Sequence, residues 1–171
     1  MPTMQIRRLT IADAPAYRAL RLRSFRDHPE AFTTSYEELE QQSFADMEKR
    51  FTSAHLKFWG AFENSVLLGY VGLEPELRIK CRHKATLIGM YVAPEQSGRG
   101  IGRALVEALL AEARASGLES IVLTVTDGND GAIRLYEHCG FRSFGVEPRA
   151  IKVGGRAYGK NHMYLDLTAT S

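Results

Sequence analysis

The sequence lacks the features that mark several large classes of protein. Its two cysteines, Cys81 and Cys139, are too few for a disulfide framework and too far apart for the paired ligands of a zinc site. Its five histidines form no paired ligand motif either. We therefore expect reduced thiols, no bound metal and a cytoplasmic protein.

Long apolar runs and blocks of one charge are also missing. No stretch approaches the roughly 18 apolar residues of a membrane helix, and the N-terminus lacks the apolar core of a signal peptide. The 22 lysines and arginines are interspersed with 20 acidic residues, for a net charge of +2, which argues against a nucleic acid partner. The 171 residues, 44% of them hydrophobic, predict a single domain spanning 1–171 that does not contact a membrane.

Three alternating glycines, Gly98, Gly100 and Gly102, form the most informative segment. They follow an apolar run over 87–92 and precede a helical pattern that starts at Ile101. A strand, a glycine loop and a helix N-terminus in this order make an anion site, because unpaired N–H groups and the helix dipole face the ligand. Glycine lets the backbone approach a phosphate where a Cβ would clash. The segment therefore predicts a phosphate or pyrophosphate ligand.

Two common phosphate motifs do not fit this segment. A P-loop requires Gly-Lys-Ser/Thr after a glycine and four residues, and no such run exists. A dinucleotide fingerprint fails at its third glycine, since Arg103 or Leu105 stands there. Arg99 and Arg103 would add mobile positive charge beside the glycines.

The segment from Ser97 to Gly102 resembles the acetyl-CoA loop of the GNAT family of N-acetyltransferases, whose motif is Arg/Gln-x-x-Gly-x-Gly/Ala. Ser97 stands where the family usually places Arg or Gln. This departure should weaken one side-chain contact to the pyrophosphate and leave the backbone cradle unaffected.

A second segment, from Asn129 to Phe141, is similar to the family's Asn-x-x-Ala-x-x-Leu-Tyr-x-x-x-Gly-Phe helix. Asn129 and Tyr136 are seven residues apart, so both side chains emerge on one helix face. The resemblance implies that Asn129 binds the pantetheine arm and that Tyr136 lies near the sulfur as a general acid. A phenol with a pKa near 10 can donate a proton to a leaving thiolate. The alternative interpretation of Tyr136 is an aromatic residue at the edge of the core.

Periodicity and turn residues predict the elements of a mixed α and β protein. The expected strands are 4–9, 57–62, 66–73, 85–92, 121–125, 141–146 and 162–167, the last two linked through Gly154-Gly155, and the expected helices are 10–27, 35–53, 100–116 and 129–139. Residues 74–82 are expected to be a loop or a long strand end.

The resemblance implies a specific α/β (α+β) fold, a mixed and mostly antiparallel sheet with helices on both faces. In this fold the strands at 85–92 and 121–125 splay apart where the cofactor enters. The Met90 carbonyl and the Val92 N–H would then be free to pair with pantetheine as an added strand would.

The implied reaction is direct transfer of acetyl from acetyl-CoA to a primary amine of a small molecule or protein. The general base stays open, because Thr86 stands where some relatives have Glu. Glu74, Glu76 and His83 are nearby candidates, as is a water relay. The absent Glu also motivates an alternative, a non-catalytic acyl-CoA-binding sensor or interaction domain. An alcohol acceptor and a homodimer formed through the late strands stay open as well.

The acceptor pocket is the part of the site that the sequence defines least. The family resemblance places it between the turn after the first helix and the late strands, at Phe25, His28, Glu30, Phe32, Tyr36 and the segment 158–162.

Overall fold

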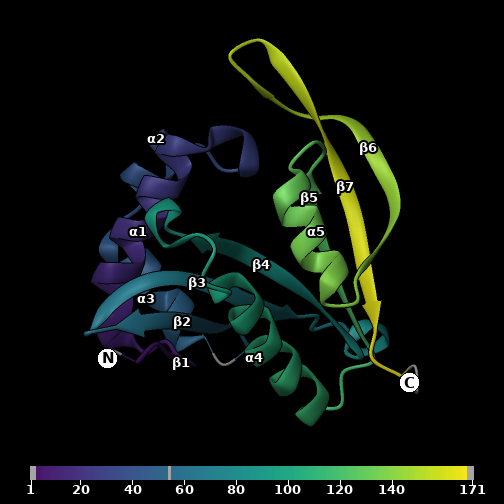
Figure 1. Ribbon diagram of the computed structural model, residues 1–171, viewed down its shortest axis with the longest axis horizontal. Helices are drawn as coiled ribbons and strands as arrows, with labels where there is room; N and C mark the ends of the chain where they lie inside the picture. Colours follow the sequence, from purple (N-terminus) through teal and green to yellow (C-terminus); the bar gives the residue numbers. More distant parts are fainter. Residues whose placement is uncertain (1–2, 54, 169–171) are drawn as a thin grey trace.

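The computed structural model describes residues 3–53 and 55–168, and it is built around one seven-stranded sheet (Figure 1). The strand order is β1-β2-β3-β4-β5-β7-β6. Every neighbouring pair is antiparallel except β4 and β5, which run parallel. The strands are β1 (Gln5–Arg8), β2 (Lys57–Glu63), β3 (Val66–Pro75), β4 (Lys84–Val92), β5 (Ser120–Thr126), β6 (Arg142–Val153) and β7 (Arg156–Asp166).

Helices cover both faces of this sheet, as expected. They are α1 (Ala14–Asp27), α2 (Tyr36–Gln41), α3 (Phe44–Thr52), α4 (Ile101–Ala115) and α5 (Asp130–His138), with short 3-10 turns η1 (Ile11–Asp13), η2 (Pro29–Ala31), η3 (Ile79–Cys81) and η4 (Pro94–Gln96). In Figure 1, α1, α2 and α3 lie on one side and α4 on the other. The predicted α/β class and the mixed, mostly antiparallel sheet are confirmed.

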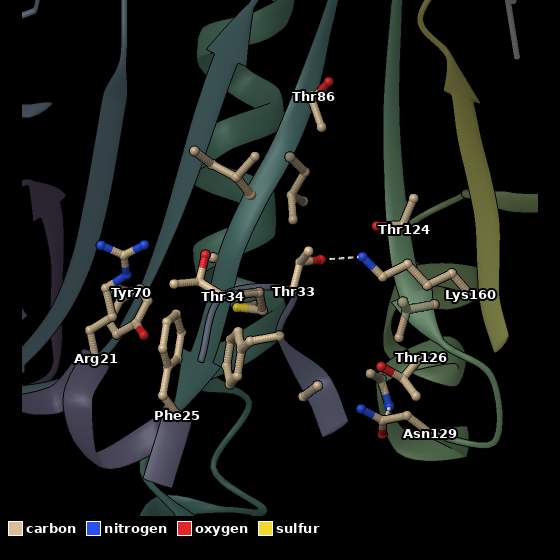
Figure 2. A pocket seen from close by; sticks show the side chains of 18 of the residues that line it. Arg21, Phe25, Thr33, Thr34, Tyr70, Thr86, Thr124, Thr126, Asn129 and Lys160 are labelled. Atoms are coloured by element: carbon tan, nitrogen blue, oxygen red, sulfur yellow. Dashed lines mark hydrogen bonds between the residues drawn. The ribbon is translucent and has the colours of Figure 1, made fainter. Parts of the chain in front are cut away.

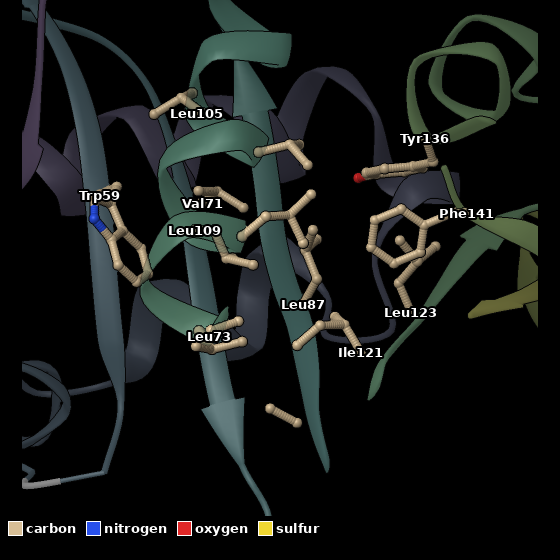
Figure 3. Packing of buried hydrophobic residues seen from close by; sticks show 14 of the residues in the cluster. Trp59, Val71, Leu73, Leu87, Leu105, Leu109, Ile121, Leu123, Tyr136 and Phe141 are labelled. Carbon is tan, nitrogen blue, oxygen red and sulfur yellow. The ribbon is translucent and has the colours of Figure 1, made fainter. Parts of the chain in front are cut away.

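Side chains of β3 alternate between the two faces of the sheet, and both faces are packed against helices. Val71 and Leu73 belong to one buried cluster with Leu109 of α4 (Figure 3). Tyr70, which points to the other face, packs edge-on against Tyr17 of α1 at a ring-centroid distance of 4.9 Å. A strand buried on both faces needs apolar side chains on both, which explains the near-continuous apolar run.

Two predicted boundaries are wrong. The expected helix 35–53 is two helices, because Gln42 is extended and the Ser43 hydroxyl accepts a hydrogen bond from the Asp46 N–H at 3.1 Å, which starts α3 anew. The last two strands are much longer than expected and form a hairpin. Its two-residue turn consists of Gly154 (φ +56°) and Gly155 (φ +81°), and positive φ at both positions matches the twist of the strands.

The predicted splay between β4 and β5 is confirmed. Pairing is confined to the first residues of each strand, from Lys84↔Ser120 to Thr86↔Val122. Beyond Thr86 the register against β3 shifts at a bulge that contains Gly89, whose φ is +62°. Strand β5 instead pairs with β7 along its whole length. The last half of β4 therefore presents an edge that β5 does not cover.

Within 3–53 and 55–168, no helix is long and apolar enough to cross a membrane.

Candidate functional site

A cavity of about 440 Å³ lies where β4 and β5 diverge. Residues of β3, β4 and β5 line it together with residues of α1, α5, β7 and the segment between η2 and α2 (Figure 2). The lining includes side chains from both faces of the sheet, so the cavity connects the α5 side with the α1 side. We call its two ends the tyrosine end (Met90, Asn129 and Tyr136) and the arginine end (Arg21, Arg50, Tyr70 and Glu74).

The tyrosine end brings together three residues that the sequence singled out. Asn129 begins α5 and accepts a hydrogen bond from the Ala132 N–H through Oδ1 at 3.3 Å, which leaves its amide NH₂ as a donor. Tyr136 is 5% exposed, and its ring packs against Phe141 at a centroid distance of 5.9 Å. In Figure 3 its hydroxyl points away from Phe141. Met90 comes from the bulged part of β4.

Burial raises the pKa of Tyr136 well above the usual value of a phenol, and the nearby Cys139 thiol raises it further. The charged phenolate is disfavoured because it would lose its hydration in this environment. Tyr136 therefore keeps its proton throughout the neutral range and can act as a proton donor.

The glycine loop connects η4 to α4, and two of its glycines need their backbone freedom. Gly98 (φ +80°) and Gly100 (φ +75°) adopt the left-handed conformation, and Gly100 is the residue that begins α4. Gly102 lies inside α4, where an added Cβ would be 3.1 Å from Cδ2 of Leu135 in α5. Ser97 is extended and exposed. The loop thus exposes helical N–H groups at the N-terminus of α4.

Arg99 and Arg103 are both engaged with their own chain. The Arg99 guanidinium pairs with the Glu63 carboxylate and donates to Gln96 Oε1 at 2.6 Å. Arg103 Nε donates to Glu107 Oε1 at 2.9 Å. Exposed pairs of this kind contribute about 0–1 kcal/mol, so a phosphate can compete with them for the guanidinium groups.

The cavity lining does not include all predicted binding residues. Met90, Asn129 and Tyr136 line it, whereas Val92 and the described residues 97–103 do not. The predicted site residues therefore fall into two groups, one that lines the cavity and one in the loop at the N-terminus of α4.

The arginine end contains charged residues that face the α1 side. Arg21 of α1 and Arg50 of α3 line the cavity with Tyr70 and Glu74 of β3. Glu74 lies opposite Thr86 in the β3–β4 register. Among the described residues that line the cavity, Glu74 is the only one with a carboxylate. Of the other predicted base candidates, Glu76 and His83 are exposed and do not line the cavity.

Two contacts tie the segment around η2 to the far side of the splay. The Thr126 hydroxyl of β5 donates to the Glu30 carbonyl at 2.6 Å. Lys160 of β7 donates to the Thr33 hydroxyl (Figure 2). These contacts hold the segment 29–35 across the cavity between the two diverging strands.

Comparison with known proteins decides the family. The model of the acetyltransferase (GNAT) family matches residues 17–141, which include the glycine loop and the helix from Asn129 to Phe141. The chain belongs to the GNAT family.

Individual GNAT relatives show how far the likeness extends. A mycothiol acetyltransferase of Thermobispora bispora is 34% identical over 139 residues, covering 79% of this chain and 45% of the relative. The RimI N-alpha-acetyltransferase of Mycobacterium tuberculosis is 34% identical over 127 residues, covering 69% and 77%. The chain thus spans about half the length of the first relative and most of the second.

Solved structures agree with this assignment. A putative acetyltransferase of Salmonella typhimurium, yncA, solved with its cofactor acetyl-CoA, superposes with a TM-score of 0.81 at 25% identity, covering 99% of this chain and 96% of the other. The fold expected from the GNAT resemblance is therefore the observed fold.

The predicted acceptor residues are only partly brought together. Phe25 and Phe32 line the main cavity and also a second hollow with Tyr36, whereas His28 and Glu30 line a third hollow with Tyr158. Sequence reasoning missed Arg21 and Arg50, whereas Lys160 belongs to the predicted segment 158–162 and lines the main cavity. A signal existed for Arg21, which stands midway between Tyr17 and Phe25 on the apolar face of its helix.

Within the described residues, no group of His, Cys, Asp or Glu is arranged to hold a metal ion, and both cysteines are unpaired.

Proposed function

We propose that this chain is an N-acetyltransferase that moves acetyl from acetyl-CoA to a primary amine of a small molecule or protein by direct transfer. One observation carries the proposal. The cavity crosses the splay between β4 and β5, so it gives a thioester on the α5 side and an amine on the α1 side access to one space.

The residues present fit acetyl-CoA in two places. The last half of β4, with Met90 and Val92, offers backbone groups on an edge that β5 does not cover, and pantetheine can pair there. Residues from Ser97 to Gly102 offer backbone N–H groups at the N-terminus of α4, with Gly98 and Gly100 in the conformation that exposes them. Arg99 and Arg103 can move from Glu63 and Glu107 to the phosphates. Asn129 would donate to the pantetheine amide.

Acetyl-CoA supplies an activated acetyl group and a thiol leaving group. Tyr136 holds its proton because it is buried, and it would donate that proton to the leaving sulfur. Glu74 would accept the proton that the attacking amine must lose, directly or through water. It faces the same cavity as Thr86 from the neighbouring strand, so it can replace the Glu that is absent at position 86.

Thermal unfolding with and without acetyl-CoA tests the cofactor assignment first. Ligand at 100 times its Kd adds roughly 2.7 kcal/mol to the free energy of unfolding, a rise in Tm of several degrees. CoA release with a panel of amines then tests the activity. No shift in Tm contradicts the cofactor assignment, and a shift without CoA release for any amine supports the alternative of an acyl-CoA sensor.

A further inference from the structure

The arginine end of the cavity carries positive charge that the chain itself does not neutralise. Arg21 and Arg50 line the cavity from α1 and α3. Among the described residues, no carboxylate lies within ion-pair distance of either guanidinium, although other arginines and lysines form eight ion pairs with carboxylates. The two side chains therefore differ from the arginines of the glycine loop, which have partners in the chain.

Each of the two guanidinium groups also has an unsatisfied buried nitrogen. Nη1 of Arg21 and Nε of Arg50 are buried and have no hydrogen-bond partner in the described part of the chain. A buried donor left without a partner costs about 1–3 kcal/mol, and more when it is charged. Such a nitrogen needs an acceptor from outside the chain, which a water, an ion or a ligand can supply.

Aromatic rings hold both arginines in place. The Arg21 guanidinium lies 5.2 Å from the centroid of the Phe25 ring and 5.9 Å from that of Tyr17. The Arg50 guanidinium lies 5.4 Å from the centroid of the Phe58 ring. These contacts orient the planar groups and leave their N–H donors to a ligand, because a ring face accepts the cation without using its hydrogen bonds.

The charges around the cavity are unequal. Arg21, Arg50 and Lys160 contribute three cations, against the single carboxylate of Glu74 among the described lining residues. Burial lowers the pKa of Arg21, and the nearby Arg50 lowers it further. An arginine still stays charged under these conditions, so the field in this part of the cavity is positive.

We infer that the acceptor is a small amine that also carries a carboxylate, such as an amino acid, and that Arg21 and Arg50 bind this carboxylate. This inference rests on the proposed acetyl transfer and specifies its substrate class. The fork of a guanidinium matches the two oxygens of a carboxylate, and Arg21 and Arg50 both line the cavity that would hold it. Glu74 is the matching partner for the amine.

Paired substrates test the inference without changing the protein. Each amino acid is compared with its amino alcohol, in which CH₂OH replaces the carboxylate and the amine is retained. CoA release is measured for both, and binding to the CoA-saturated protein is measured by calorimetry. We expect amino acids to be favoured in kcat/KM by about tenfold or more, the effect of a hydrogen bond to a charged group.

Three variants assign this preference to the two arginines. Arg21→Met and Arg50→Met keep most of the side-chain volume and remove the charge, and each should raise KM for amino acids by about tenfold and abolish the preference over the alcohols. Arg114→Met, at the exposed end of α4, is the matched control and should change nothing. Acetyl-CoA affinity, measured in parallel, should be the same in all variants.

The outcomes distinguish the two proposals. If the wild-type protein does not bind acetyl-CoA, the proposed function itself is contradicted. Intact acetyl-CoA binding with no preference for acids, in turnover or in binding, overturns the inference and leaves the acetyltransferase proposal in place. A preference for amino phosphonates or for peptide N-termini over amino acids also overturns it, as does a preference for acids that persists in Arg21→Met and Arg50→Met.

Discussion

The two ends of the cavity between β4 and β5 are built in different ways. The tyrosine end and the glycine loop come from one stretch of chain, residues 90–141, in which the end of β4 is followed by α4, β5 and α5. The arginine end is assembled from α1, α3 and β3, and Lys160 of β7 closes the same cavity. The groups proposed to bind acetyl-CoA therefore form a local motif, whereas the groups proposed to bind the acceptor come from distant segments.

Changing Gly100 should have the largest effect, a loss of acetyl-CoA affinity well beyond what the accompanying loss of stability explains. Gly100→Val places a β-branched residue at φ +75° and puts a Cβ in front of the phosphate site, so we expect acetyl-CoA binding to be lost, by about 100-fold or more. Calorimetry measures the affinity. Normal binding by this variant would contradict the placement of the pyrophosphate.

Gly117 offers a matched control for Gly100→Val. It has a similar φ of +78°, and an added Cβ would also meet nothing within 4 Å, but it lies at the other end of α4. Gly117→Val should cost a comparable 1–2 kcal/mol of stability and leave acetyl-CoA affinity unchanged.

Removing the Tyr136 hydroxyl should have the next largest effect. Tyr136→Phe keeps the packing against Phe141 and deletes the proposed proton donor, so kcat should fall by about 100-fold with acetyl-CoA affinity retained. Tyr91→Phe, which also removes a buried hydroxyl, is the control and should not change kcat. Unchanged turnover in Tyr136→Phe would exclude the acid role.

The pH profile sharpens this test. Since burial raises the pKa of Tyr136, the phenol stays protonated beyond the usual value near 10. Any decrease of kcat that depends on Tyr136 must therefore occur above pH 10 and be absent in Tyr136→Phe.

Cutting the tie between β5 and η2 tests whether the segment 29–35, which spans the cavity, affects amine binding separately from acetyl-CoA binding. Thr126→Val loses the hydrogen bond to the Glu30 carbonyl, so the segment that spans the cavity should be held less firmly. We expect KM for the amine to rise about three- to tenfold and stability to fall by about 1 kcal/mol, with acetyl-CoA affinity unchanged. A loss of acetyl-CoA affinity instead would show that the two ends are not independent.

Removing Arg99 should have a smaller effect on the acetyl-CoA side. Arg99 is exposed and must leave Glu63 and Gln96 to reach a phosphate, so Arg99→Ala should reduce acetyl-CoA affinity by less than about tenfold. The reduction should be largest at low salt, where the charge is least screened. Affinities measured at two ionic strengths would contradict this if the loss were greater at high salt.

Gly102 should show the smallest effect, because alanine there keeps the backbone N–H and only tightens the contact with Leu135. In Gly102→Ala the new Cβ approaches Leu135 Cδ2 to 3.1 Å, and a small shift of that side chain can relieve the contact. Alanine also favours the helix by about 1 kcal/mol over glycine, which offsets the cost. Urea unfolding should show a change below about 1 kcal/mol, and a larger loss would indicate a closer α4–α5 contact.

Much of the fold was predictable because the signals are local. The strand over Ala85–Val92, the glycine loop and the helix after it were located from apolar periodicity and three glycines, and the break at Gly140 from its position after a helical pattern. The single helix predicted over 35–53 was wrong. The Ser43 cap that starts α3 is also a local signal, but acidic residues at the start of this segment and basic residues near its end favoured one continuous helix. The final hairpin was underestimated because β6 is exposed along most of its length, which leaves little apolar alternation to detect.

The sequence by itself identified the GNAT family and the segments proposed to bind acetyl-CoA, because the motifs of the Gly98–Gly102 loop and the Asn129–Tyr136 helix are local in the chain. Only the tertiary structure decided which charged residues share the cavity. Arg21, Arg50 and Glu74 lie on three elements, and nothing in their local sequence requires them to meet. The packing of α1 and α3 against β3 brings them to one space, because apolar side chains of these three elements share one buried cluster.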